Sequence, residues 1–119
     1  MRETFFKRVQ MLMYAGAGMS QPIWDRIMQV ADEMVPGGVL LCTGFGSTET
    51  GPFALMCTER QDRGGNLGLP AHGVIFKLAP QGGKFEGRVK GPAVTPGYWR
   101  NPKLSAEAFD EEGFYRFGD

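Results

Sequence analysis

Two short apolar runs enclose an amphipathic segment in the first 43 residues, and this order constrains the fold more than any other feature of the chain. Residues 9–14 and 39–43 are mostly apolar, and the first run is followed by an Ala-Gly-Ala-Gly turn. Between the runs, apolar side chains recur every three to four positions, which predicts a helix: Ile23, Ile27, Ala31 and Met34. The strand–helix–strand order favours a right-handed parallel unit, because two consecutive parallel strands are almost always connected in that way.

Local signals place the ends of this helix. The side-chain oxygen of Ser20 can cap its first turn, where Pro22 is also tolerated, and the Pro-Gly-Gly sequence at 36–38 ends it. Trp24 is expected to be a core or interdomain anchor on the same apolar side as Ile23. The run at 9–14 is bounded by glycine and is typical of a strand buried on both faces.

The rest of the chain is rich in turns, since only two of its 18 glycines precede Pro36. Alternation in 74–79 and 85–90 around a Pro-Gln-Gly-Gly turn predicts an antiparallel hairpin. We expect Phe85 and Val89 on one face of this hairpin and a solvated charged face that carries Glu86, Arg88 and Lys90. A short helix or turn at 101–110 and a strand at 114–117 would complete a small antiparallel sheet or partial barrel. The predicted fold class is therefore α/β, with a parallel β-α-β part at 1–58 and a β-rich part at 59–119.

Composition excludes several classes of protein. The 13 basic and 13 acidic residues balance, which argues against a nucleic-acid or anionic-membrane binder that works through bulk charge. No stretch approaches the roughly 20 apolar residues of a membrane span. Cys42 and Cys57 are the only cysteines, too few for a disulfide framework, so a reduced, cytoplasmic location is expected.

Candidate binding residues concentrate in the sequence Gly-Phe-Gly-Ser-Thr-Glu-Thr-Gly-Pro at 44–52, directly after the second predicted strand. Ligand-binding loops follow the carboxyl ends of parallel strands. Glycine lets a ligand approach the backbone, hydroxyls can bond phosphate, and a carboxylate can hold a divalent cation. The residues alone are equally compatible with an ordinary turn, because the lysine of a Walker phosphate loop is absent.

Residues 44–51 resemble the Gly-Tyr-Gly-x-Thr-Glu signature of the adenylate-forming superfamily of acyl- and aryl-CoA synthetases, luciferases and peptide-synthetase adenylation domains. Three further segments resemble motifs of that superfamily in the same order along the chain. They are the Gly-Ala segment at 15–18, the Gly-Pro and Gly-Tyr-Trp stretch at 91–102, and the Tyr-Arg-Phe-Gly-Asp sequence at 115–119. The phrase at 109–115 further resembles the branch that activates aryl or medium-chain acids, with feruloyl-CoA synthases as the nearest relatives.

The resemblance implies a role for each matching residue. Thr48 would bond the adenylate phosphate, Glu49 would help to hold Mg²⁺, Phe45 would stack on adenine where most members have Tyr, and Asp119 would bind the ribose hydroxyls. The remaining pocket residues would be Gly16, Ala17, Gly18, Gly44, Gly46 and Ser47. Phe117 stands where Thr is common and would remove a polar contact beside Asp119.

The resemblance also implies a reaction, in which a carboxylate and ATP give an acyl-adenylate that is then transferred to CoA. The superfamily's phosphate loop and its C-terminal domain with the catalytic lysine are not in this sequence. We therefore expect a piece of the large N-terminal domain that is inactive alone and that self-associates through exposed apolar surface. The alternative is a non-enzymatic α/β module that binds a nucleotide or a protein, with Tyr98 and Trp99 as exposed anchors.

Overall fold

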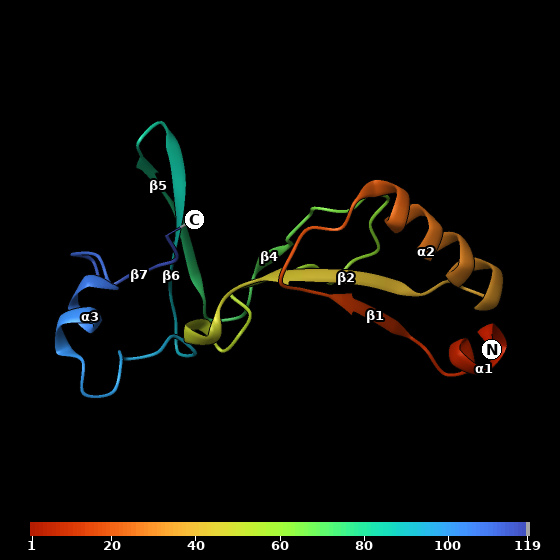
Figure 1. Cartoon of the computed structure of the whole chain (residues 1–119), viewed down its shortest axis with the longest axis horizontal. Helices are drawn as coiled ribbons and strands as arrows, with labels where there is room; N and C mark the ends of the chain where they lie inside the picture. Colours follow the sequence, from red (N-terminus) through yellow and green to blue (C-terminus); the bar gives the residue numbers. More distant parts are fainter. Residues whose placement is uncertain (119) are drawn as a thin grey trace. The chain divides into compact units, whose positions relative to one another are not determined.

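The first of two compact units contains the predicted parallel strands. In a computed structural model that describes residues 1–118, this unit comprises residues 1–44 and 56–69 (Figure 1). Strand β1 (Met11–Tyr14) pairs in parallel with β2 (Leu40–Phe45), and helix α2 (Gln21–Met34) connects them, which confirms the β-α-β unit. The short strands β3 (Leu55–Met56) and β4 (Leu69–Pro70) extend the sheet in the order β1-β2-β3-β4. The sequence reading did not anticipate helix α1 (Arg2–Phe6).

The buried face of α2 includes the predicted Ala31 and Ile27 but is centred on Trp24 and Met28. Trp24 is 2% exposed and packs with Met28 and Leu41, whereas Ile23 is 56% exposed. The expectation for Trp24 as an anchor is therefore confirmed, and that for Ile23 is wrong, because the large indole ring occupies the space under the helix. Ser20 precedes the helix, but its side chain makes no capping hydrogen bond, which corrects the predicted cap.

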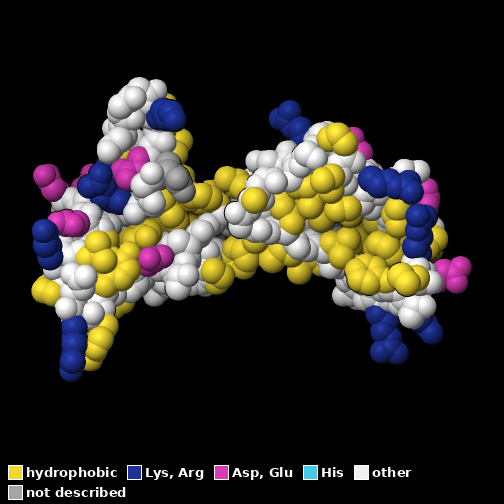
Figure 2. Space-filling model, viewed as in Figure 1, with side chains coloured by type: hydrophobic (Ala, Val, Ile, Leu, Met, Phe, Trp, Pro, Cys, Tyr) yellow, Lys and Arg dark blue, Asp and Glu magenta, His cyan; other side chains and the backbone are white. Residues whose placement is uncertain are grey.

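Strand β1 is not buried on both faces as predicted. Its residues alternate between exposed and half-buried, and Met11 and Met13 are 49% and 41% exposed. The reason is its place at the end of the sheet order, where only β2 lies beside it among the described strands. Figure 2 shows hydrophobic side chains at the surface of the unit that contains α2 and β1.

The second compact unit comprises residues 45–55 and the chain from residue 70 onward. Strand β5 (Ile75–Gln81) pairs antiparallel with β6 (Lys84–Lys90), which pairs antiparallel with β7 (Tyr115–Arg116). Gly82 and Gly83 form the turn with φ of +56° and +81°, the two-residue geometry that glycine adopts without strain. Helix α3 (Pro102–Glu107) is capped by Asn101, whose side-chain oxygen accepts from Leu104 N at 3.1 Å. The predicted antiparallel sheet is confirmed, and the predicted domain limits at 58 and 59 remain a prediction.

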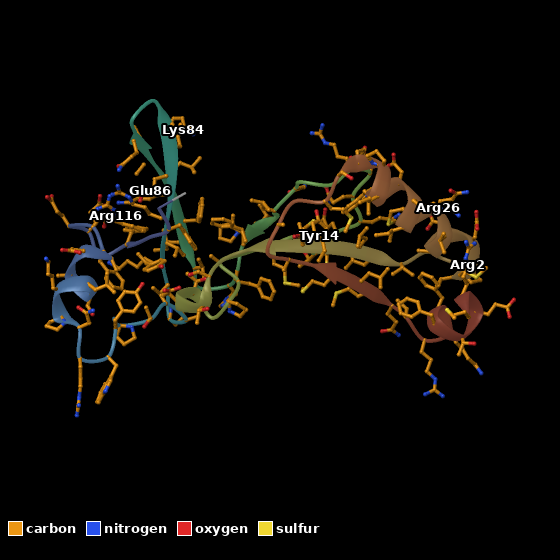
Figure 3. The ribbon with its side chains drawn as sticks, in the orientation of Figure 1. Arg2, Tyr14, Arg26, Lys84, Glu86 and Arg116 are labelled. Carbon is orange, nitrogen blue, oxygen red and sulfur yellow. The ribbon has the colours of Figure 1, made fainter. Side chains whose placement is uncertain are left out.

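The expected solvated face of the hairpin is instead a buried ion-pair network. Glu86 is 5% exposed and accepts from Arg88 Nε at 2.6 Å, and Arg88 Nη1 donates to Asp110 at 2.9 Å. Arg116 of β7 lies 3.5 Å from the other oxygen of Glu86. Both residues are labelled in Figure 3. Phe85, predicted to face the core, is 64% exposed. The prediction is therefore wrong for Phe85 and Glu86, whereas Val89 is 0% exposed and Lys90 is exposed as expected.

The four-stranded sheet leads into the loop that carries the signature. β2 ends at Phe45, and a single 3-10 turn, η1 (Thr48–Thr50), follows.

Among the described residues, no helix is long and apolar enough to cross a membrane.

Candidate functional site

The Gly-Ala segment and the start of the signature leave the parallel sheet at the same edge. Tyr14 is the Cα partner of Thr43, so the segment 15–18 after β1 and Gly44 near the end of β2 follow paired positions. The Thr43 hydroxyl donates to the Tyr14 carbonyl at 2.9 Å and fixes this register. Residues 15–18 are exposed, and neither Gly16 nor Gly18 has an atom within 4 Å of the place a Cβ would take. This edge therefore offers bare backbone to a ligand.

The loop after β2 is tightly folded around one buried hydroxyl. Thr50 is 2% exposed, and its Oγ1 accepts from Ser47 N at 2.9 Å and lies 3.0 Å from Ser47 O. A Cβ on Gly46 would overlap the Pro52 carbonyl oxygen, so only glycine fits there. Gly51 ends the turn in the left-handed conformation, with φ of +67°. The loop thus has one conformation that its own sequence requires.

Folding the loop in this way leaves two functional groups accessible. Thr48 is exposed at the first position of η1, and Glu49 is half-buried at the second. The backbone N–H of Glu49, the neighbouring Ser47 side chain and the hydrogen bond from Tyr98 lower the pKa of the Glu49 carboxyl. The loop therefore presents a hydroxyl donor and an ionised carboxylate on adjacent residues.

Tyr98 is the site residue that sequence reasoning missed. Its hydroxyl donates to Glu49 Oε1 at 2.9 Å, and Thr95 N donates to the Glu49 carbonyl at 2.7 Å. The prediction of Tyr98 as a surface anchor is thus wrong, whereas Trp99 is 88% exposed as expected. The Gly-Tyr pair at 97–98 was a signal that this stretch matters, but nothing in the spacing links it to Glu49.

Phe45 is surrounded by aromatic rings at the start of the loop. Its ring centroid lies 4.6 Å from that of Phe117 and 6.4 Å from that of Phe76. Phe45 and Phe117, two positions at which the sequence differs from the motifs that it resembles, therefore contact each other. Asp119, the predicted ribose ligand, lies outside the described residues.

The predicted site residues fall into two sets, one in each compact unit. Gly16, Ala17, Gly18 and Gly44 belong to the unit of β1 and α2, and residues 45–49 belong to the unit of β5 and β6. Within the second unit, the segment 93–98 supports the loop, since a Cβ on Gly51 would lie 3.2 Å from the Ala93 carbonyl oxygen.

Comparison with known proteins gives a consistent result. No family model matches the chain. It is 36% identical over 90 residues to a chloroplastic long-chain-fatty-acid–[acyl-carrier-protein] ligase of Arabidopsis thaliana, covering 69% of this chain and 12% of the relative. It is also 36% identical over 100 residues to the medium-chain fatty-acid–CoA ligase of Escherichia coli, covering 76% and 18%. The A domain of carboxylic acid reductase from Segniliparus rugosus, in complex with AMP, superposes with a TM-score of 0.66 and 30% identity over 90% of this chain and 16% of that one.

The chain belongs to the adenylate-forming superfamily. It spans only 12 to 18% of the length of these two curated relatives. A malonyl-CoA ligase in a ternary product complex with methylmalonyl-CoA and AMP also superposes over 99% of the chain, with a TM-score of 0.69 and 25% identity. The chain therefore corresponds to about a quarter of the length of that ligase.

The residues of this adenylate-forming segment fit a magnesium ion that is coordinated mainly by substrate phosphates and water, with one protein carboxylate. No cluster of three or more His, Cys, Asp or Glu side chains suited to a metal lies within residues 1–118. Mg²⁺ commonly uses one or two carboxylates together with substrate phosphates and water. Glu49, ionised and next to the exposed Thr48, provides one such carboxylate.

Proposed function

We propose that this chain forms part of the nucleotide site of an ATP-dependent enzyme that converts a carboxylic acid to an acyl-adenylate and then to a CoA thioester. The observation that carries the proposal is the loop at 44–51, which places an exposed Thr48 and an ionised Glu49 side by side at the end of a parallel strand. Homology to acyl-CoA ligases gives this loop a chemical context.

Each residue has a role that suits its position. The Thr48 hydroxyl donates to a phosphate oxygen, and the Glu49 carboxylate holds Mg²⁺, which when bound neutralises negative charge on the phosphates. The ring of Phe45 contacts the adenine face. Asp119 accepts from the ribose hydroxyls.

The remaining site residues provide space rather than charge. Gly16, Ala17, Gly18 and Gly44 would let a ligand approach the backbone, and Gly46 and Ser47 shape the loop. We further propose that residues 1–58 and 59–119 are consecutive parts of one adenylation domain. An aryl substrate of the feruloyl class is the most specific assignment that the sequence at 109–115 supports. The two free, buried cysteines suit a reducing compartment such as the cytoplasm.

The proposal is tested by titrating AMP into the chain and following backbone amide signals by NMR. We expect millimolar binding, for which about 4 kcal/mol is available, with shifts centred on residues 45–51. Thr48→Ala should weaken binding at least about threefold, since a hydrogen bond to a charged group is lost. Thr58→Ala is the matched control because Thr58 is also exposed but belongs to the other compact unit. Equal affinities for the two variants, or shifts elsewhere in the chain, would contradict the proposal and favour a separate binding module.

A complete ligase of this superfamily with the same motif provides the catalytic test. Glu49→Gln there should slow adenylation more than it raises the KM for the acid, because the carboxylate acts on charge that develops during transfer. An unchanged adenylation rate with only a raised KM would make Glu49 a wall of the acid pocket instead.

A further inference from the structure

The carboxylate of Glu49 is held by a residue from a distant part of the chain. The Tyr98 hydroxyl donates to Glu49 Oε1 at 2.9 Å, although the two residues are 49 positions apart. A glutamate side chain has several rotatable bonds, and each hydrogen bond to its carboxylate restricts them. The bond from Tyr98 holds one of the two carboxylate oxygens, Oε1.

Tyr98 is itself rigidly placed by helix α3. Its backbone N donates to Ser105 Oγ at 2.8 Å. A Cβ on Gly97 would lie 2.8 Å from the same oxygen, and the φ of +145° at Gly97 is one that glycine adopts readily. Ser105 Oγ in turn bonds to Asn101 O at 2.8 Å at the start of the helix. The tyrosine is thus attached to a capped helix rather than to a loose loop.

A second bond holds the backbone of Glu49 at the same place. Thr95 N donates to the Glu49 carbonyl at 2.7 Å, and Thr95 Oγ1 donates to the Gly97 carbonyl at 2.9 Å. The segment 95–98 therefore contacts Glu49 at both its main chain and its side chain. Attachment at two points fixes a direction as well as a position, which a single bond cannot do.

We propose that Tyr98 is a positioning residue that sets the direction of the Glu49 carboxylate in the nucleotide site. This proposal rests on the proposed function of Glu49. Tyr98 acts through Glu49 and does not contact the reacting atoms. Partners that orient a metal-binding carboxylate typically affect affinity or activity by roughly 10- to 100-fold.

The orientation is measured first in the 119-residue chain by NMR couplings about χ1 and χ2 of Glu49. We expect one rotamer in the wild type and averaged couplings in Tyr98→Phe, with the amide signals of the β5–β6 hairpin unchanged. Ser105→Ala should give intermediate averaging, because it removes the acceptor of Tyr98 N. Tyr14→Phe is the control, since it removes a hydroxyl that accepts from Gly65 N in the other unit. Identical couplings in wild type and Tyr98→Phe would overturn the proposal.

The consequence is measured in a complete ligase that has both residues at the matching positions. Tyr98→Phe should lower the adenylation kcat roughly tenfold or more and leave the KM for the acid nearly unchanged. In a Glu49→Gln background it should have little further effect, because the two residues act together. A Glu49→Gln variant with full activity would refute the proposed function itself. A low adenylation kcat in Glu49→Gln together with a wild-type kcat in Tyr98→Phe would refute only the role of Tyr98.

Discussion

The rings of Phe45 and Phe117 pack at 4.6 Å between centroids and are inclined by 53°. Neither ring carries a hydroxyl, and both belong to an apolar set that includes Phe76, Tyr115 and Val89. Phe45 at the start of the binding loop thus contacts the residue that follows β7 through aromatic rings.

Replacing Phe117 by Thr should lower the free energy of unfolding by about 1 to 2 kcal/mol, because an aromatic pair and part of its apolar burial are lost. Phe85→Thr is the control, since Phe85 is 64% exposed on the neighbouring strand and should change stability by less than about 0.5 kcal/mol. Urea unfolding followed by far-UV circular dichroism measures both. Equal losses would mean that the contact with Phe45 contributes nothing.

Trp24→Ala should destabilise the β1–α2–β2 unit by about 3 to 5 kcal/mol, because a 2%-exposed indole would be replaced by a cavity. The adjacent Ile23→Ala should have an effect below about 0.5 kcal/mol, since Ile23 is 56% exposed. Thermal unfolding of the two variants compares them directly. A larger effect at Ile23 would support the helix face expected from the sequence.

Acid should weaken the second unit through Asp110. Burial alone would raise the pKa of Asp110, but hydrogen bonds from Lys77, the Phe114 backbone N–H and Arg88 hold it below its usual range. The folded state thus binds this proton more weakly than the unfolded state, where the pKa is about 3.9. The stabilisation is present above about pH 4 and is lost as the pH falls further.

Urea midpoints measured between about pH 5 and pH 2 test this assignment. Asp110→Asn should be less stable than the wild type at pH 5 and should lose less on acidification. Thr58→Ala, at an exposed position without a titratable group, should keep the wild-type slope. A slope that is unchanged in Asp110→Asn would assign the acid sensitivity to other carboxylates.

The exposed β1 strand should make the chain self-associate at high concentration. Met11 and Met13 are 49% and 41% exposed on a strand that pairs only with β2 among the described residues, and such an edge can pair with a second copy. Met13→Lys should therefore reduce the average mass in light scattering. Leu104→Lys adds the same charge on α3 and should not. A wild-type chain that stays monomeric across the concentration series would contradict the expectation.

Secondary structure was largely predictable because it depends on local patterns. The Pro-Gly-Gly sequence at 36–38 indicates the end of helix α2, and the glycines at 82–83 indicate the hairpin turn. Asn101 before Pro102 indicates the start of helix α3. The burial of Glu86 was not predictable, since it depends on Arg88 in the same strand and on Arg116 some 30 positions later. The prediction that Ile23 is buried was wrong for a related reason, because periodicity alone does not decide which of two adjacent large residues faces the sheet.

The contiguous part of the candidate site was predictable from the sequence, but its long-range contact was not. The loop at 44–51 is a contiguous motif, so its glycines and its Thr-Glu pair are visible in the sequence. The role of Tyr98 depends on a contact across 49 positions, and no local pattern reports such a contact. Whether the assigned residues bind a nucleotide stays a prediction until the titrations are made.

The attachment of Glu49 to residues 95 and 98 limits how this loop can be transplanted. A short peptide of residues 44–52 would lack the Thr95 and Tyr98 donors, and so would a graft of these nine residues onto another α/β scaffold. Either would carry the full signature and still present its carboxylate in many directions. A working graft would have to include the chain as far as Ser105, so the smallest portable form of this motif is two segments and a helix.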